Sequence, residues 1–305
     1  MKAPATRRTS TNRRRGRLIA IFLWCLSCLP FTVLQRLGGA FGRLRYVCGG
    51  RARRTVEANL ACCFPEQSAV QQRRLALCSL QASTTALLEM GAIWHWSCEK
   101  NIQLIVDVRG QALLDLALAK KRGVILLTPH IGNWELVGYY AAQQARVTSL
   151  YAPSKIPELD RLMYEGRIRN GSTLVPTNTA GVRSLLKALK AGEVVIILPD
   201  QVPEEGAGLF APFFGRPAYT MTLLTSLAQR TGAEVLCCYA LRRADRRGFD
   251  VVVTAADPAI AAADEQQAVN ALNRSVENCV LACPEQYQWE YKRFRERPAG
   301  MASLY

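Results

Sequence analysis

The spacing of hydrophobic and polar positions changes once along the chain, and the change separates a helical part from a mixed part. Before about residue 100 the pattern predicts two helices: one over residues 55–63, stopped by Pro65, and a long one that begins after Ser68 and runs to about Trp96. From about residue 104, short runs of β-branched and aliphatic residues alternate with helical segments.

The mixed part contains short apolar runs that predict β-strands. A run such as VVIIL is what a sheet requires when helices cover both of its faces. Between the runs lie helices such as residues 180–191, where Val182, Leu185 and Leu189 share one face and Gly192 follows the end. Strands that alternate with helices predict an α/β fold with a central mixed, mostly parallel sheet covered by helices on both faces. The predicted strands are residues 123–129, 147–151, 173–175, 194–198, 234–239 and 250–254.

Residues 18–34 (LIAIFLWCLSCLPFTVL) form an uncharged apolar run between Arg17 and Arg36. A run of about 17 residues is at the short end for a bilayer span. We expect an N-terminal membrane-anchoring helix here, which either crosses the membrane or lies in its surface, because similar numbers of basic residues flank both ends. A cleaved signal peptide would share the basic start and apolar core, but no small-x-small cleavage site follows the run.

The net charge of +15 is concentrated near the N-terminus. Residues 1–54 hold thirteen Lys and Arg and no acid, which leaves +2 for residues 55–305. This distribution fits an anionic membrane surface, whereas a nucleic-acid partner would favour basic residues spread over a folded face. We therefore expect a basic membrane segment over residues 1–54 and one globular domain over residues 55–305.

The eleven cysteines do not follow the pattern of a disulfide framework or a zinc site. Cys25 and Cys28 lie in the apolar run, and no second C-x-x-C completes a metal site with them. Adjacent pairs in other apolar stretches favour small buried side chains in a reducing compartment.

Two histidines are the candidates for acid–base chemistry. His95 lies between Trp94 and Trp96 near the end of the long helix, where packing is the simpler interpretation. His130 directly follows a predicted strand, at the carboxyl end where open α/β sheets place their ligand sites. Glu135 lies in the first turn of the next helix, which Gly132 or Asn133 can cap.

The pair His130 and Glu135 suits general-base catalysis, in which the imidazole takes a proton from a hydroxyl and the carboxylate fixes its tautomer. Positions five apart point about 140° apart on a continuous helix, so a direct contact requires His130 to lie in the bend before the helix. Taken alone, the H-x4-E spacing fits equally well a core histidine beside a capping glutamate. The chain contains no G-x-S-x-G elbow, P-loop or G-x-G-x-x-G, and no cysteine stands in a polar setting near a histidine.

The stretch TPHIGNWELVG resembles the block that opens the active site of the late acyltransferases of lipid A biosynthesis, a bacterial family with an H-x4-D/E pair. The basic and apolar N-terminal segment is also similar to that family, as are several blocks in the same order. These are NLACCFPE (59–66), GRIRN (166–170), LLKALKAGEVVIILPDQ (185–201), FAPFFGRPA (210–218) and PEQYQWEYKRFRERPAG (284–300).

The resemblance implies transfer of a fatty acyl chain from acyl carrier protein to a hydroxyl of a lipid A precursor. It implies direct transfer without an acyl-enzyme, cofactor or metal, at the cytoplasmic face of the bacterial inner membrane. His130 takes the role of base and Glu135 that of its partner, within residues 55–305 as the catalytic domain. Substrate contacts are implied for Asn133, Arg167, Arg169, Asp200 and Gln201.

Other interpretations stay open at this point. Arg167 and Arg169 fit equally a solvated or ion-paired helix surface, and Trp289, Arg293 and Phe294 fit core packing. The sequence VPEEG follows PDQ where a second acid is common in the family, which leaves the role of Glu204 and Glu205 open. The same chemistry on a lysophospholipid or an amino-acid-containing lipid is the nearest alternative function, and a non-catalytic membrane scaffold is an alternative of another class.

Overall fold

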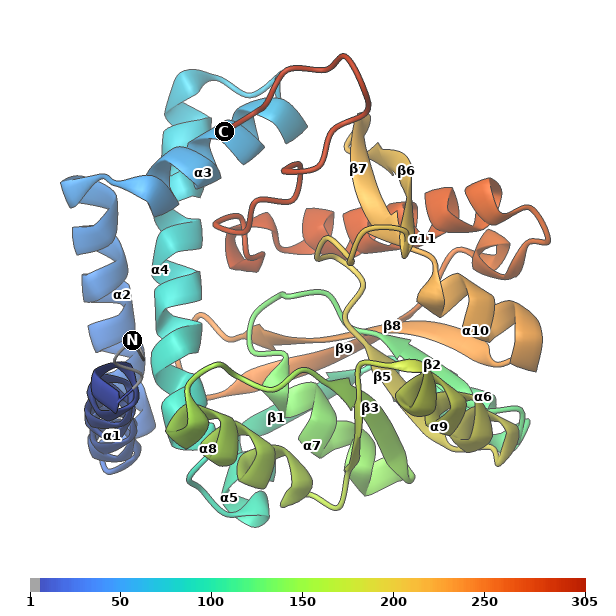
Figure 1. Ribbon diagram of the computed structural model, residues 1–305, viewed down its shortest axis with the longest axis horizontal. Helices are drawn as coiled ribbons and strands as arrows, with labels where there is room; N and C mark the ends of the chain where they lie inside the picture. The colour runs from blue at the N-terminus through green and yellow to red at the C-terminus, as the bar shows by residue number, and fades with distance from the viewer. Residues whose placement is uncertain (1–5) are drawn as a thin grey trace, which may run out of the picture.

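A seven-stranded sheet runs through the centre of the molecule (Figure 1). The computed structural model describes residues 6–305, with side chains from residue 16. The strand order is β1-β9-β8-β2-β5-β3-β4, and every neighbouring pair is parallel except β8 with β9. The predicted mixed, mostly parallel sheet is confirmed. The strands are β1 (Ile105–Arg109), β2 (Val124–Leu127), β3 (Val147–Tyr151), β4 (Thr173–Pro176), β5 (Val194–Ile197), β8 (Glu234–Arg242) and β9 (Phe249–Ala255).

Side chains of the central strands alternate between two buried layers. Ile125 and Ile197 belong to the layer under α9, α10 and α11, whereas Leu126 and Ile196 belong to the layer under α6 and α7. This alternation is the reason that the strands are apolar at every position. Helices on both faces are therefore confirmed. The helices are α6 (Gln111–Ala119), α7 (Glu135–Gln144), α9 (Thr179–Lys190), α10 (Leu223–Thr231) and α11 (Glu265–Ala282).

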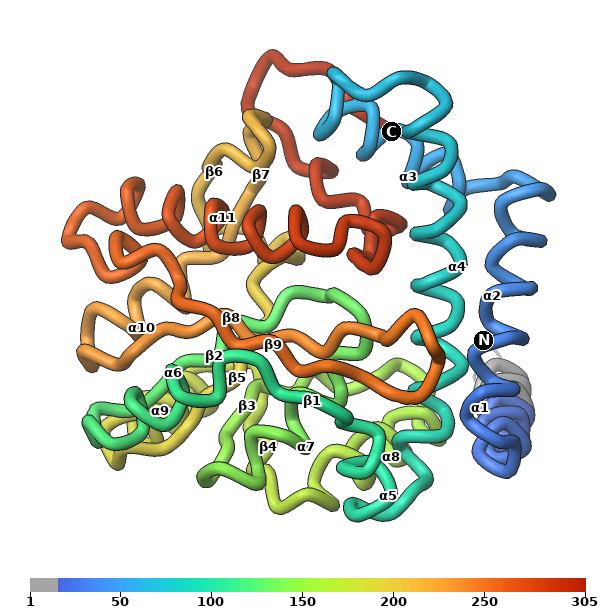
Figure 2. The backbone as a smooth tube through the Cα atoms, turned by 180° about the vertical axis from the view of Figure 1, so that it is seen from behind, coloured from blue at the N-terminus to red at the C-terminus, as the bar shows by residue number. Residues whose placement is uncertain are grey.

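The long helix α4 (Ala69–Ile93) stands beside the sheet and carries the other N-terminal helices (Figure 2). Ser68 caps it, since the Ser68 side chain accepts from the Gln71 backbone and the Gln71 side chain accepts from the Ser68 backbone. Helix α3 (Arg51–Cys63) precedes it and α5 (Cys98–Ile102) follows it. The two predicted helices of this part are confirmed to within a few residues.

The single helix expected over residues 18–34 is wrong. The chain forms α1 (Thr6–Ser27) and α2 (Phe31–Cys48), with a break at residues 28–30. Pro30 causes the break because it lacks the N–H that a continuous helix would use, and it serves instead as the N-cap of α2. Within residues 6–305, none of the helices combines the length and apolar character needed to cross a bilayer.

Helix α2 packs closely against α4 through two glycines. A Cβ added at Gly38 would lie 2.5 Å from the Cα of Thr85, and one at Gly42 would lie 2.4 Å from the Cα of Gln81. The buried side chain of Leu34 extends this contact. Helix α2 of the N-terminal segment is therefore packed on the rest of the chain. The domain boundary at residue 54 stays a prediction.

Several elements were not expected from the sequence. Strand β1 (IVDVR) is partly exposed and carries charges, so its pattern is weak. The hairpin of β6 (Gly208–Phe213) and β7 (Arg216–Met221) contains Pro212 and Pro217, which pair with each other and disguise the strands. The remaining elements are α8 (Pro157–Ile168) and the short helices η1 (Pro258–Ala261) and η2 (Pro284–Gln286).

The cysteines are only in part the buried side chains expected. All eleven cysteines are free thiols in the structure. Cys25, Cys28 and Cys48, on or beside the first two helices, are exposed.

Candidate active site

A cavity of about 460 Å³ lies at the carboxyl ends of β2 and β5. The segment between β2 and α7 supplies His130, Trp134 and Glu135 to its wall, the segment after β5 supplies Gln201, and α8 supplies Arg167. Parallel strands that lie side by side end at the same edge of the sheet, so residues distant in sequence meet there.

The carboxylate that holds His130 is Asp200. Its Oδ1 lies 2.8 Å from the imidazole Nδ1, and its Oδ2 accepts the backbone N–H of His130 at 2.9 Å. Burial by itself would raise the pKa of Asp200, but the contacts with His130 outweigh burial and hold that pKa below its usual range. With the proton on Nδ1 directed at a carboxylate, Nε2 is the nitrogen left to accept a proton.

The Nε2 atom of His130 lies near the side-chain amide of Gln201, which in turn contacts that of Gln288. The side-chain nitrogen of Gln201 lies 3.2 Å from it and 3.4 Å from the Oε1 of Gln288. The ring of Trp134 meets the imidazole edge to face, with centroids 4.7 Å apart. Gln201 therefore lines the cavity beside His130, and its substrate contact stays a prediction, whereas Gln288 and Trp134 are neighbours that were not predicted.

Glu135, the predicted partner of His130, binds Arg167 instead. The Nε and Nη2 of Arg167 donate to the two carboxylate oxygens at 3.0 and 2.6 Å. Burial by itself would raise the pKa of Glu135, but the contacts with Arg167 outweigh burial and hold that pKa below its usual range. Glu135 begins α7 and points along the helix toward α8, whereas His130 lies before the bend at Gly132, so the two side chains take different partners.

Two of the predicted substrate contacts are internal. The Nη1 of Arg169 donates to the carbonyls of Trp94 and Trp96 at 2.9 and 2.7 Å, and so ties the end of α8 to the end of α4. Asn133 is fully buried and donates to Glu89 at 3.1 Å. Both side chains therefore hold the frame of the site, in place of the substrate contact predicted for them. Asp200 likewise lies under His130, whereas Arg167 lines the cavity.

One side of the cavity is apolar. It runs from the strand ends toward the interior between α7 and the strands β3 and β5. Gly138 of α7 leaves room here, since a Cβ at this position would meet only Asn170, at 3.5 Å. The aliphatic residues of the lining include Val147, Leu150, Leu174, Ile196, Ile197, Leu198, Val202, Met221 and Leu223.

The remaining candidates have structural places. The Nδ1 of His95 lies 2.6 Å from the Gly91 carbonyl, one helical turn away, in agreement with the packing interpretation. Arg293 is buried and donates to the Tyr219 carbonyl at 2.6 Å. Glu204 and Glu205 lie exposed in the loop after β5. Within the described residues, His, Cys, Asp and Glu side chains form no cluster of three or more that could hold a metal ion.

The sequence is similar to acyltransferases over most of its length. Residues 5–296 match the family described as bacterial lipid A biosynthesis acyltransferase. The chain is 30% identical over 284 residues to the lipid A biosynthesis lauroyltransferase of Escherichia coli (strain K12), covering 93% of this chain and 92% of that protein. The palmitoleoyltransferase of the same organism gives the same identity and coverage, and its myristoyltransferase is 25% identical over 276 residues, covering 90% and 83%. This chain therefore belongs to the family of bacterial lipid A biosynthesis acyltransferases.

Proposed function

We propose that this protein transfers a fatty acyl chain from acyl carrier protein to a hydroxyl of a lipid A precursor, with His130 as the general base. The observation that carries the proposal is the imidazole of His130, held at Nδ1 by Asp200 with Nε2 in the cavity. This arrangement is the one that general-base catalysis needs, because the carboxylate fixes the tautomer and stabilises the imidazolium that forms.

The acyl group passes directly from the donor to the acceptor, without an acyl-enzyme. Nε2 of His130 removes the proton of the acceptor hydroxyl, and the hydroxyl oxygen attacks the carbonyl carbon of the thioester. The carbon–sulfur bond then breaks, and the imidazolium returns its proton to the departing thiolate. The amide of Gln201, 3.2 Å from Nε2, is close enough to donate to the oxygen that carries negative charge in between.

The cavity offers separate surfaces to the two substrates. Its apolar side suits a fatty acyl chain, since the hydrophobic effect favours removal of methylenes from water. Arg167 keeps Nη1 free of the Glu135 contact, and this group can bind a phosphate of the acceptor. The pairing with Glu135 holds the guanidinium in place for that contact.

The N-terminal helices attach the protein to the membrane in this proposal. Both expose large apolar side chains, and exposed Arg17, Arg36 and Arg43 suit an anionic lipid surface. We place the protein at the cytoplasmic face of the bacterial inner membrane, where its free thiols remain reduced and acyl carrier protein is available. The exposed apolar residues are Leu18, Ile21, Phe22 and Trp24 of α1 and Phe41, Leu44 and Val47 of α2.

The test is an assay of the purified full chain with acyl-loaded carrier protein and either a lipid A precursor or a lysophospholipid. We expect product with the lipid A precursor, and a loss of turnover of about 10²–10⁴-fold in His130→Ala, the usual worth of a general base. Asp200→Asn should lower kcat in the same direction with little change in KM.

His95→Asn is the matched control, because it changes the other histidine, outside this cavity, and it should keep near wild-type turnover. Near-normal turnover in His130→Ala would refute the assignment of the base. Acylation of the lysophospholipid alone would refute the proposed acceptor.

A further inference from the structure

Glu89 is a buried carboxylate that the proposed chemistry does not use. It lies on α4 with no exposed surface. Arg242 of β8 donates to it through Nε at 2.7 Å and Nη2 at 2.5 Å, Gln35 of α2 donates at 3.0 Å, and Asn133 donates at 3.1 Å. A buried carboxylate needs this degree of pairing, because burial without partners strongly disfavours the charged form.

One of those donors belongs to the segment that carries His130. Asn133 is the side chain that fastens residues 130–134 to α4, and its backbone N–H donates to the Ala240 carbonyl at 3.0 Å. The same segment is held from the other side, because Gly132 donates to the Gln286 carbonyl and His130 accepts from the Gln288 backbone, each at 3.0 Å.

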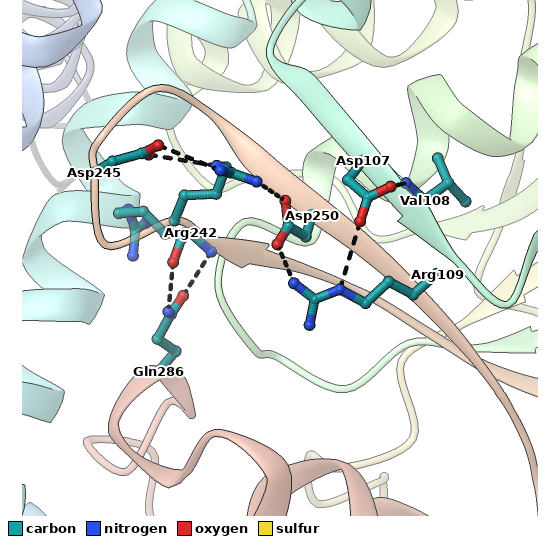
Figure 3. Close-up of polar contacts among 8 residues, drawn as sticks. Asp107, Val108, Arg109, Arg242, Asp245, Asp250 and Gln286 are labelled. Carbon is teal, nitrogen blue, oxygen red and sulfur yellow. Dashed lines mark hydrogen bonds and ion pairs between the residues drawn. The ribbon is translucent and has the colours of Figure 1, made fainter.

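Arg242 connects Glu89 to that second set of contacts. Figure 3 shows the side-chain amide of Gln286 bridging the backbone of Arg242, with Arg242 N–H donating to Oε1 and Nε2 donating to the carbonyl, both at 2.9 Å. Gln286 in turn receives the N–H of Gly132 on its own carbonyl. Glu89 therefore reaches the His130 segment directly through Asn133 and indirectly through Arg242 and Gln286.

We propose that Glu89 is a positioning residue, whose carboxylate sets the place of His130 relative to Asp200 by holding Asn133 and Arg242. The proposal rests on the proposed function for the role of His130. The carboxylate is needed because it only accepts, and all of its neighbours donate. The Oδ1 of Asn133 and the Oε1 of Gln35 are buried without a hydrogen-bond partner, so Glu89 alone selects the orientation of each amide.

Glu89→Gln tests the charge at nearly constant volume. In this variant the side-chain NH₂ group, a donor, would lie opposite the donors of Arg242, or opposite that of Asn133 and so rotate the Asn133 amide. We expect either change to move the His130 segment. A misplacement of about 1 Å at a catalytic group can cost about 10²-fold in rate. We expect kcat to fall by about ten- to a hundredfold while KM for both substrates changes little.

Asp250→Asn is the matched control. Asp250 is also a buried carboxylate held by two arginines, since Arg109 donates to it at 2.5 Å and Arg243 at 2.8 Å (Figure 3). These contacts join β9 to β1 and to the turn after β8, and neither arginine is a partner of Glu89 or of residues 130–134 in the hydrogen bonds described above. We expect Asp250→Asn to lower the melting temperature about as much as Glu89→Gln does, but to keep kcat within about twofold of wild type.

A second measurement does not depend on turnover. The chain has only two histidines, so the imidazole ¹⁵N resonances of His130 can be assigned with the help of His95→Asn. We expect Glu89→Gln to shift the Nδ1 resonance of His130 and Asp250→Asn to leave it unchanged. If Glu89→Gln does not fold, Asn133→Ala cuts the same contact from the other end and should shift the resonance alike.

If the Nδ1 resonance of His130 in Glu89→Gln or Asn133→Ala matches that of wild type, the positioning role is overturned. This conclusion holds whichever acceptor the lipid assay identifies. Conversely, a wild-type chain that acylates no lipid A precursor overturns the proposed function and leaves the resonance test of Glu89 intact. Equal kcat in Glu89→Gln and Asp250→Asn, with wild-type activity present, also overturns the positioning role.

Discussion

Glu135 lines the cavity and Asp200 does not, and each of these carboxylates has a different partner. Asp200 touches His130 at two points, and Glu135 takes both arms of Arg167. The first pair has the geometry for proton transfer, while the second fixes a guanidinium that lines the cavity. In both cases the pKa of the carboxyl group lies below its usual range, so both remain ionised at neutral pH.

At this scale only some of the residues singled out in the sequence line the cavity, and the pairs that form differ from the pair predicted. His130, Glu135, Arg167 and Gln201 do line one cavity. The His130–Glu135 contact was inferred from spacing along the chain, whereas the pair that forms depends on β2 and β5 being neighbours in the sheet. That adjacency is a property of the whole sheet, and a short sequence pattern does not contain it.

The Glu135–Arg167 pair gives a pH-dependent stability. Because the folded-state pKa of Glu135 is lowered, its contribution is complete above the unfolded value of about 4.3 and is lost as the pH falls through the folded value. We expect Glu135→Gln to lower the free energy of unfolding by roughly 3 kcal/mol at pH 7. Below about pH 4.3 the difference from wild type should shrink by about 1.4 kcal/mol per pH unit.

Denaturant titrations at pH 7, 5 and 3.5 measure this difference. Glu165→Gln on the same helix α8 is the control, because the Arg161–Glu165 pair is exposed, at 3.6 Å, and its loss should cost less than about 1 kcal/mol. A gap between wild type and Glu135→Gln that stays constant down to pH 3.5 would contradict the assigned direction of the pKa.

Among the elements, α2 and α4 show how packing overrides the apparent meaning of an apolar run. The run over residues 18–34 looks continuous, but Pro30 divides it, and α2 then uses Gly38 and Gly42 to approach α4. The strands with strong apolar runs were predicted within a few residues, because burial on both faces leaves a plain signature. Strands β1, β6 and β7 lack a continuous apolar run, because β1 is partly exposed and β6 and β7 contain prolines. Their pairing depends on neighbouring strands, which a local sequence pattern does not reveal.

The glycines of α2 offer a matched pair of substitutions. A methyl at Gly42 would meet the backbone of Gln81, whereas one at Gly39 would meet only the end of the Gln81 side chain, at 4.0 Å. We expect Gly42→Ala to lower the free energy of unfolding by about 1–3 kcal/mol, because the helices must separate. Gly39→Ala should raise it by up to about 1 kcal/mol, because alanine favours the helix.

Thermal or denaturant unfolding of the two single variants compares them directly. Equal stability of Gly39→Ala and Gly42→Ala would show that the close contact between α2 and α4 is absent in solution.

Exposed apolar and basic side chains occur together along α1 and α2, within the described residues from 16 onward. The cavity lies at the carboxyl ends of β2 and β5. Helix α4 stands between the sheet and these two helices (Figures 1 and 2). A helix pair that lies in the lipid surface would hold the globular part beside the membrane that contains its acceptor.

Vesicle binding tests this arrangement. Replacing Phe22 and Trp24 together by serine should weaken binding to phosphatidylglycerol-containing vesicles at least about tenfold, because each large apolar side chain contributes about 1.5–3 kcal/mol when buried. Val70→Ser with Leu116→Ser is the control, since these side chains are 73% and 63% exposed but lie on other elements. Equal binding of the two double variants would mean that α1 does not enter the lipid.

The contacts that lock His130 also fix when, during synthesis, the site can form. Gly132, His130 and Gln201 are tied to residues 286 and 288, which the ribosome adds more than 150 residues after His130. A nascent chain can form β2, β5 and the contacts of this loop with Asp200, Glu89 and Ala240, yet the contacts with residues 286 and 288 form only when the last tenth of the protein has emerged. Chains that end before residue 286 therefore lack part of the support of the His130 loop, and we expect them to lose activity.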